Sequence, residues 1–82
     1  LLLERPLWIL TRPQRLAVYG ATPCHDGPLQ LVDGPERIES GWWDGADTAR
    51  DYSVAETGAG ARLWIYREHR PPAGWYLQGI FG

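Results

Sequence analysis

The sequence predicts a small, mostly β domain: an antiparallel meander whose sheet is curled or forms a partly open barrel, with an extended N-terminal arm. Tyr, Trp and β-branched residues, which favour strands, alternate with polar residues through much of the second half of the chain. Ten Gly and seven Pro interrupt these segments at spacings typical of tight turns. With 82 residues, the chain can bury only a thin hydrophobic core.

The first third of the chain, residues 1–28, is predicted to be an extended arm and loop. Prolines, which cannot donate to a sheet ladder, interrupt it at Pro6, Pro13, Pro23 and Pro28. The apolar runs 7–10 and 16–19 could each be a brief edge strand or part of the arm, and residues 20–27 are predicted as a loop.

The apolar start of the arm is unusual for a free tail. We expect Leu7 and Ile9 to pack onto the sheet or onto a partner, which leaves Trp8 on the opposite side because neighbouring side chains of an extended segment alternate.

Residues 29–82 are predicted to form the β domain itself. Strands are expected at 29–32, 37–39, 50–56, 62–67 and 75–81, with a turn at 33–35, one helical turn at 46–49, and hairpin connections at 57–60 and 69–74. In the 62–67 strand, Leu63 and Ile65 share one face while Trp64 and Tyr66 share the other. This strand should therefore be covered on both sides.

Composition argues against several function classes. All eight basic residues are Arg, and with ten acidic residues the net charge is −2, far from the basic charge of dedicated nucleic-acid binders. Cys24, His25 and His69 lack the spacing of a zinc site, and adjacent Cys24 and His25 point apart in an extended chain. We therefore expect no catalytic site, metal or cofactor.

Acidic and apolar residues lead to similar expectations about chemistry and location. Asp44, Asp47 and Asp51 have a spacing that could bind Mg²⁺, but we expect them to cap a turn. No apolar run is long enough to cross a membrane, and the single cysteine fits a reducing cytoplasm. The absence of Met favours a piece of a longer protein.

Aromatic residues interleaved with Arg are the one pattern that indicates binding. Such residues form protein-interface hot spots, stack on single-stranded bases, or simply fill the core of a small domain. In the Trp42–Trp43 pair, one side chain should face outward as an interface anchor. The candidate partner-binding residues are Trp42, Trp43, Asp44, Arg50, Tyr52, Trp64 and Trp8.

One long string carries a family resemblance. The sequence Gly-Pro-Glu-Arg-Ile-Glu-Ser-Gly-Trp-Trp-Asp-Gly at residues 34–45 resembles the extreme C-terminal region of ImuB proteins, and the similarity continues at residues 5–10, 50–52, 61–67 and 74–81. ImuB proteins resemble Y-family translesion polymerases but lack their catalytic acids. They act as scaffolds in bacterial SOS mutagenic repair.

The resemblance implies a non-catalytic interaction module in the cytoplasm, associated with the nucleoid. In the ImuB family, the C-terminal part is implicated in holding the RecA-like accessory protein ImuA and an error-prone polymerase of the replicative type. The alternative is a module that binds single-stranded DNA and positions the complex on damaged template. A third possibility is a structural cap that stabilises the rest of the scaffold.

Overall fold

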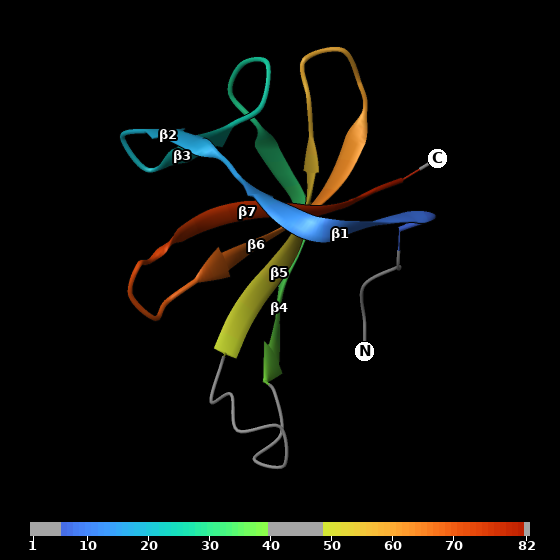
Figure 1. Ribbon diagram of the computed structural model, residues 1–82. Coiled ribbons are helices and arrows are strands. Elements are labelled where there is room, and N and C mark those ends of the chain that lie inside the picture. The colour runs from blue at the N-terminus through green and yellow to red at the C-terminus, as the bar shows by residue number, and fades with distance from the viewer. Residues whose placement is uncertain (1–5, 40–48, 82) are drawn as a thin grey trace.

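The computed structural model describes residues 6–39 and 49–81, and these residues form seven strands and no helix (Figure 1). The strands are β1 (Trp8–Arg15), β2 (Ala17–Tyr19), β3 (Thr22–Cys24), β4 (Gln30–Glu39), β5 (Ala49–Glu56), β6 (Arg62–Glu68) and β7 (Gly74–Ile80). The predicted mostly β fold is therefore confirmed. Most of the helical turn expected at residues 46–49 lies outside the described residues.

The strands form one antiparallel five-stranded sheet in the order β1-β7-β6-β5-β4 and a separate β2–β3 hairpin. Strands β5, β6 and β7 follow one another as the predicted meander. They fan out in Figure 1, as expected of a strongly twisted sheet. No pairing joins β1 to β4 among the described residues, so this sheet is open and does not close into a barrel.

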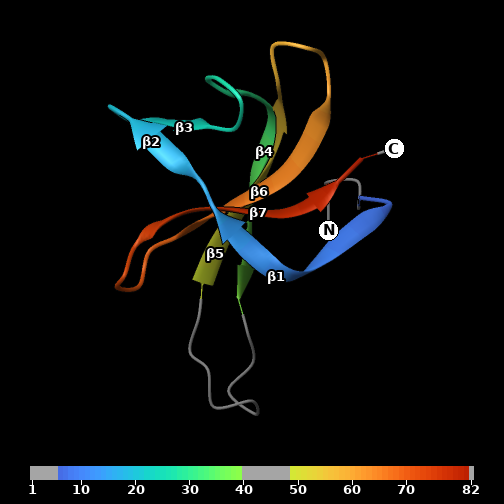
Figure 2. The same ribbon diagram turned by 45° about the horizontal axis from the view of Figure 1, so that its top comes forward.

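The N-terminal segment is an edge strand of the main sheet. Residues of β1 pair with β7, from Trp8 opposite Ile80 to Arg15 opposite Tyr76. The boundary expected after residue 28, between an arm and a β domain, therefore separates β1 from the sheet to which it is hydrogen-bonded. The loop predicted at residues 20–27 is wrong for β3, which pairs with β2 in a hairpin that projects from the end of β1 (Figure 2).

The turn predicted at residues 33–35 is also wrong. Strand β4 continues from Gln30 to Glu39, with register shifts on either side of Asp33. Gly34 has a φ of 93°, and a Cβ at this position would lie 2.8 Å from the carbonyl oxygen of Tyr52. Glycine therefore allows the strand to bulge against β5 and continue, where the sequence pattern predicted a stop.

The core consists of two clusters on opposite faces of the sheet. We call them the aliphatic cluster (Leu16, Leu29, Ala55, Leu63, Ile65, Leu77) and the aromatic cluster (Tyr52, Val54, Trp64, Tyr66). Strand β6 contributes alternate residues to each, which confirms that it is covered on both sides. Leu16, which joins β1 to β2, belongs to the aliphatic cluster. Its N–H donates to the carbonyl of Trp75 at 2.9 Å, which holds this junction against β7.

Candidate functional site

The structure describes four of the seven predicted site residues. Trp42, Trp43 and Asp44 lie outside the described residues. Tyr52 and Trp64 lie in the core, while Arg50 is at its rim and Trp8 is at the open edge of the sheet.

Tyr52 and Trp64 pack against each other inside the aromatic cluster. Their ring centroids are 4.5 Å apart, and each residue is only 7% exposed. The centroid of the Tyr52 ring also lies 5.1 Å from that of Tyr66, the residue opposite it on β6. Of the three roles considered for these aromatics, core packing is the one that their burial fits.

Arg50 closes the rim of the aromatic cluster. Its guanidinium lies 4.5 Å from the centroid of the Tyr66 ring, and its Nε lies 3.7 Å from Glu68 Oε1. Burial lowers the pKa of Arg50, but a hydrogen bond to Tyr52 and nearby Tyr66 and Glu68 outweigh it, so that the pKa is raised overall. Arg50 is therefore a fixed cation whose face is occupied by a core ring.

Beside these candidates, the β4–β5 pair carries an ionic network that the sequence analysis did not identify. Arg37 Nε and Nη2 donate to Asp51 Oδ1 and Oδ2 at 2.8 and 3.1 Å, and His69 Nε2 lies 2.7 Å from Oδ2. The hydrogen bonds from Arg37 are the main cause that lowers the pKa of Asp51 to about 2. The network joins β4 to β5 and to the connection after β6, which is a structural role.

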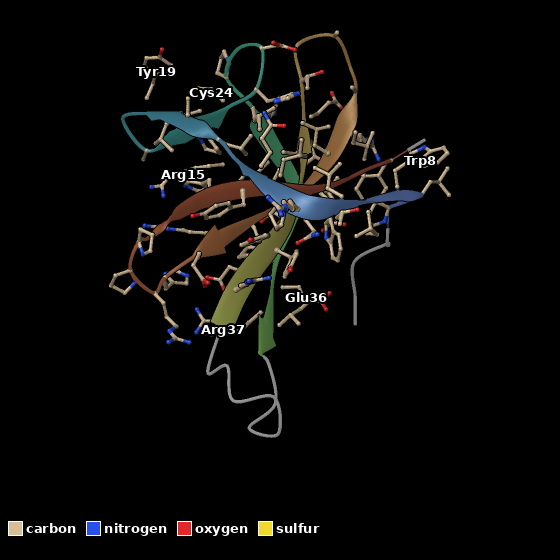
Figure 3. The ribbon with its side chains drawn as sticks, in the orientation of Figure 1. Trp8, Arg15, Tyr19, Cys24, Glu36 and Arg37 are labelled. Atoms are coloured by element: carbon tan, nitrogen blue, oxygen red, sulfur yellow. The ribbon has the colours of Figure 1, made fainter. Side chains whose placement is uncertain are left out.

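The open edge of β1 holds the most exposed apolar segment described. Leu7, Trp8 and Ile9 are 74%, 66% and 56% exposed. Leu7 and Ile9 therefore do not pack onto the sheet as expected; packing onto a partner stays a prediction. Figure 3 shows Trp8 at the outer end of β1.

The exposure of Ile9 is explained by the residue opposite it on β7, which is Gly79. Glycine offers Ile9 no side chain to pack against. The buried ring of Pro6 occupies the space, since a Cβ on Gly79 would lie 2.5 Å from Pro6 Cγ. Pro6 thus fills the site on the sheet that Ile9 was expected to cover.

A second surface lies where β1 and β7 meet the β2–β3 hairpin. A cavity of about 340 Å³ opens there, lined by Arg15, Val18, Gly20, Ala21, Arg67, Ala73, Gly74 and Trp75. Arg15 Nη2 donates to the carbonyl of Ala73 at 2.8 Å, and the Arg67 guanidinium lies 5.8 Å from the Trp75 ring centroid. Sequence reasoning missed Arg15 because its partners lie some sixty positions along the chain.

The described residues contain no group of three or more His, Cys, Asp or Glu side chains arranged to hold a metal ion. Nor is any described segment a helix with the length and apolar character of a membrane span.

Comparison with known proteins adds no relative: no protein-family model, no curated protein and no solved structure matches the chain. The similarity to ImuB proteins stays a prediction from the sequence.

Proposed function

We propose that this chain is a non-catalytic protein-interaction module of a bacterial translesion-synthesis scaffold of the ImuB kind. It docks the RecA-like accessory protein, the error-prone replicative-type polymerase, or both, at the nucleoid in the cytoplasm during SOS mutagenic repair. The residue string at 34–45 supports the family, and the open edge of β1 supports the role.

The observation that carries the role is the exposure of Leu7, Trp8 and Ile9 at the start of β1, an edge strand of the main sheet. A small domain gains stability from every apolar side chain that it buries, so three adjacent exposed ones are costly to leave in water. Trp is also the residue type most enriched in interface hot spots. Covering by a protein partner accounts for this arrangement.

The test is binding of the immobilised chain to the purified accessory protein and, separately, to the purified polymerase, at about 50 mM and about 200 mM salt. We expect at least one to bind with an affinity that changes little with salt, because the interface is apolar. The control is Tyr19→Ala, which removes an exposed aromatic at the tip of the β2–β3 hairpin, away from the β1 edge, and should leave binding unchanged. Failure of both proteins to bind would refute the proposal.

The second candidate function is single-stranded DNA binding, favoured by the arginines and Trp75 around the cavity beside the hairpin. Arg and aromatic side chains together can hold a phosphate backbone and stack on bases. The discriminating measurement is the affinity for a single-stranded oligonucleotide over the same salt range. A steep loss of affinity with salt, abolished in Arg15→Gln together with Arg67→Gln, would favour this alternative.

A further inference from the structure

The backbone of β1 presents hydrogen-bonding groups to its open side at Ile9. The carbonyl oxygen of Trp8 faces β7, because a Cβ on Gly79 would lie 2.7 Å from it. The carbonyl of Leu10 also faces β7, where it accepts a hydrogen bond from Gln78 Nε2 at 3.2 Å. Alternation along a strand therefore turns the N–H and C=O of Ile9 away from β7.

On both faces of the sheet, a row of apolar side chains runs to the β1 edge, and the last side chain of each row is exposed. On one face, exposure rises across the row from Leu63 to Ile80 to Trp8, at 4%, 37% and 66%. On the other face, Ile9 continues the row that begins at buried Trp64 and crosses Gly79. A further strand beside β1 would place side chains next to both Trp8 and Ile9.

The charged residues of β1 indicate which charge the added strand should carry. Arg12 and Arg15 are the only charged residues between positions 6 and 15. Neither of them forms an ion pair within the part of the chain that the structure describes. Pro6 and Pro13, which have no N–H, limit the free ladder to residues 7–12. An acidic residue at one end of a short added strand would lie opposite Arg12.

We propose that the open edge of β1 receives an extended segment of a partner protein as a sixth strand, apolar on both faces and with Asp or Glu opposite Arg12. The proposal rests on the proposed function and names the kind of partner segment that the interaction module recognises. Main-chain hydrogen bonds at Ile9 supply affinity, and the flanking side chains supply specificity.

A second copy of this chain fits the edge less well. Another β1 would bring no acidic residue to Arg12. The acidic edge of β4 in another copy is interrupted by register shifts on either side of Asp33, and Pro35 removes a backbone donor from it. The observations therefore favour a different protein.

The probe is a synthetic peptide, Glu-Val-Ile-Ala-Ile-Val-Glu with blocked ends, which is apolar on both faces when extended, titrated into the isotopically labelled chain. Matched controls are the same peptide with Lys at both ends and one with Pro at its centre. We expect the acidic peptide to bind at least about tenfold more tightly than either control, a difference of about 1.4 kcal/mol. Binding should slow hydrogen exchange of the Ile9 amide.

Two variants of the chain test separately the main-chain hydrogen bond at Ile9 and the charge of Arg12. Ile9→Pro removes the outward N–H and should weaken peptide binding about tenfold relative to Ile9→Ala, while the two variants melt at similar temperatures, because that N–H makes no bond to β7. Arg12→Glu leaves the backbone intact and should reverse the preference between the acidic and the Lys peptide, so it tests the proposal even if Ile9→Pro unfolds.

The outcomes distinguish this inference from the proposed function. The inference is overturned if the acidic peptide does not bind, if Arg12→Glu leaves the preference unchanged, or if Ile9 becomes protected with rising chain concentration alone, which would indicate a second copy. If the peptide binds as expected but neither repair protein does, the proposed function fails and the inference stands. If a repair protein binds Ile9→Pro and Arg12→Glu as tightly as the original chain, the inference fails and the proposed function stands.

Discussion

The two edge strands of the main sheet, β1 and β4, differ in the bulges, prolines and charges along their open sides. Strand β4 shifts register on either side of Asp33, contains Pro35, and carries the charged residues Asp33, Glu36 and Arg37. Bulges, prolines and charges are the features with which natural sheets prevent other strands from adding to an edge. Strand β4 thus has the features of a protected edge.

Strand β1 has much less protection over its first residues. It pairs in register with β7 at Trp8 and Ile9, carries no charge before Arg12, and exposes apolar side chains on both faces. The irregularity in β1 comes later, between Ile9 and Gln14. Both edges expose apolar side chains, but only the first residues of β1 combine that exposure with a regular pairing and no charge, and this is why we assign the partner to β1.

Replacing the two tryptophans that lie at the core and at the edge should separate stability from binding most strongly. Trp64→Ala should cost about 3–5 kcal/mol of stability, because it empties the centre of the aromatic cluster. Trp8→Ala should change stability by less than about 0.5 kcal/mol yet cost about 2 kcal/mol of partner binding. Urea unfolding and a binding titration on both variants measure these effects. Equal losses of stability would show that the β1 edge is part of the core.

Filling the bulge of β4 should be the next largest effect. Gly34→Ala combines a φ of 93° with a Cβ 2.8 Å from the Tyr52 carbonyl oxygen, so we expect a loss of about 3 kcal/mol. Gly60→Ala is the matched control, since Gly60 has a φ of 90° but open space, and should lose only about 1 kcal/mol. Thermal melts compare the two. Similar losses would mean that the close approach to β5 contributes nothing.

Loss of the ion pairs of Asp51 should have a smaller effect on stability, and one that depends on pH. The pKa of Asp51 is lowered from 3.8 to about 2 in the folded state, so its contribution is present above pH 4 and is lost as the pH falls toward 2. Asp51→Asn should reduce stability at neutral pH by about 1 kcal/mol after solvent screening, and the difference from the original chain should vanish near pH 2. Glu56→Gln, which affects only a 3.5 Å contact with Arg62, should have less effect at neutral pH. A difference that persisted at pH 2 would rule out the charge as its cause.

The smallest expected effect is at the exposed apolar residues of β4. Leu31 is exposed like the residues of β1, but it lies beside the bulges of a protected edge. Leu31→Ser should therefore change partner binding by less than about 0.5 kcal/mol. A loss comparable to that of Trp8→Ala would show that both edges bind partners and that the contrast between them is wrong.

Sequence reasoning succeeded where strands and turns are adjacent in the chain. The segments 50–56 and 62–67 alternate, and a short Gly-containing turn between them closes a hairpin with Tyr52 opposite Tyr66. The burial of Leu63 to Tyr66 on both faces was also readable from their uninterrupted apolar character. At the candidate site, the same reasoning grouped Trp8, which the structure leaves exposed, with Tyr52 and Trp64, which are core residues.

Alternation and turn chemistry act between neighbouring residues, and they are enough to predict the mostly β class, the β5–β7 meander and the two-sided burial of β6. The three-dimensional fold is needed to see that β1 joins β7, that β4 bulges at Gly34 and continues, and that Trp64 is buried while Trp8 is exposed. These features depend on pairings far apart in the chain, such as Ile9 with Gly79 and Gly34 with the backbone of Tyr52. A side chain's own preference is the same at every position, but its burial depends on which residue the fold places opposite it.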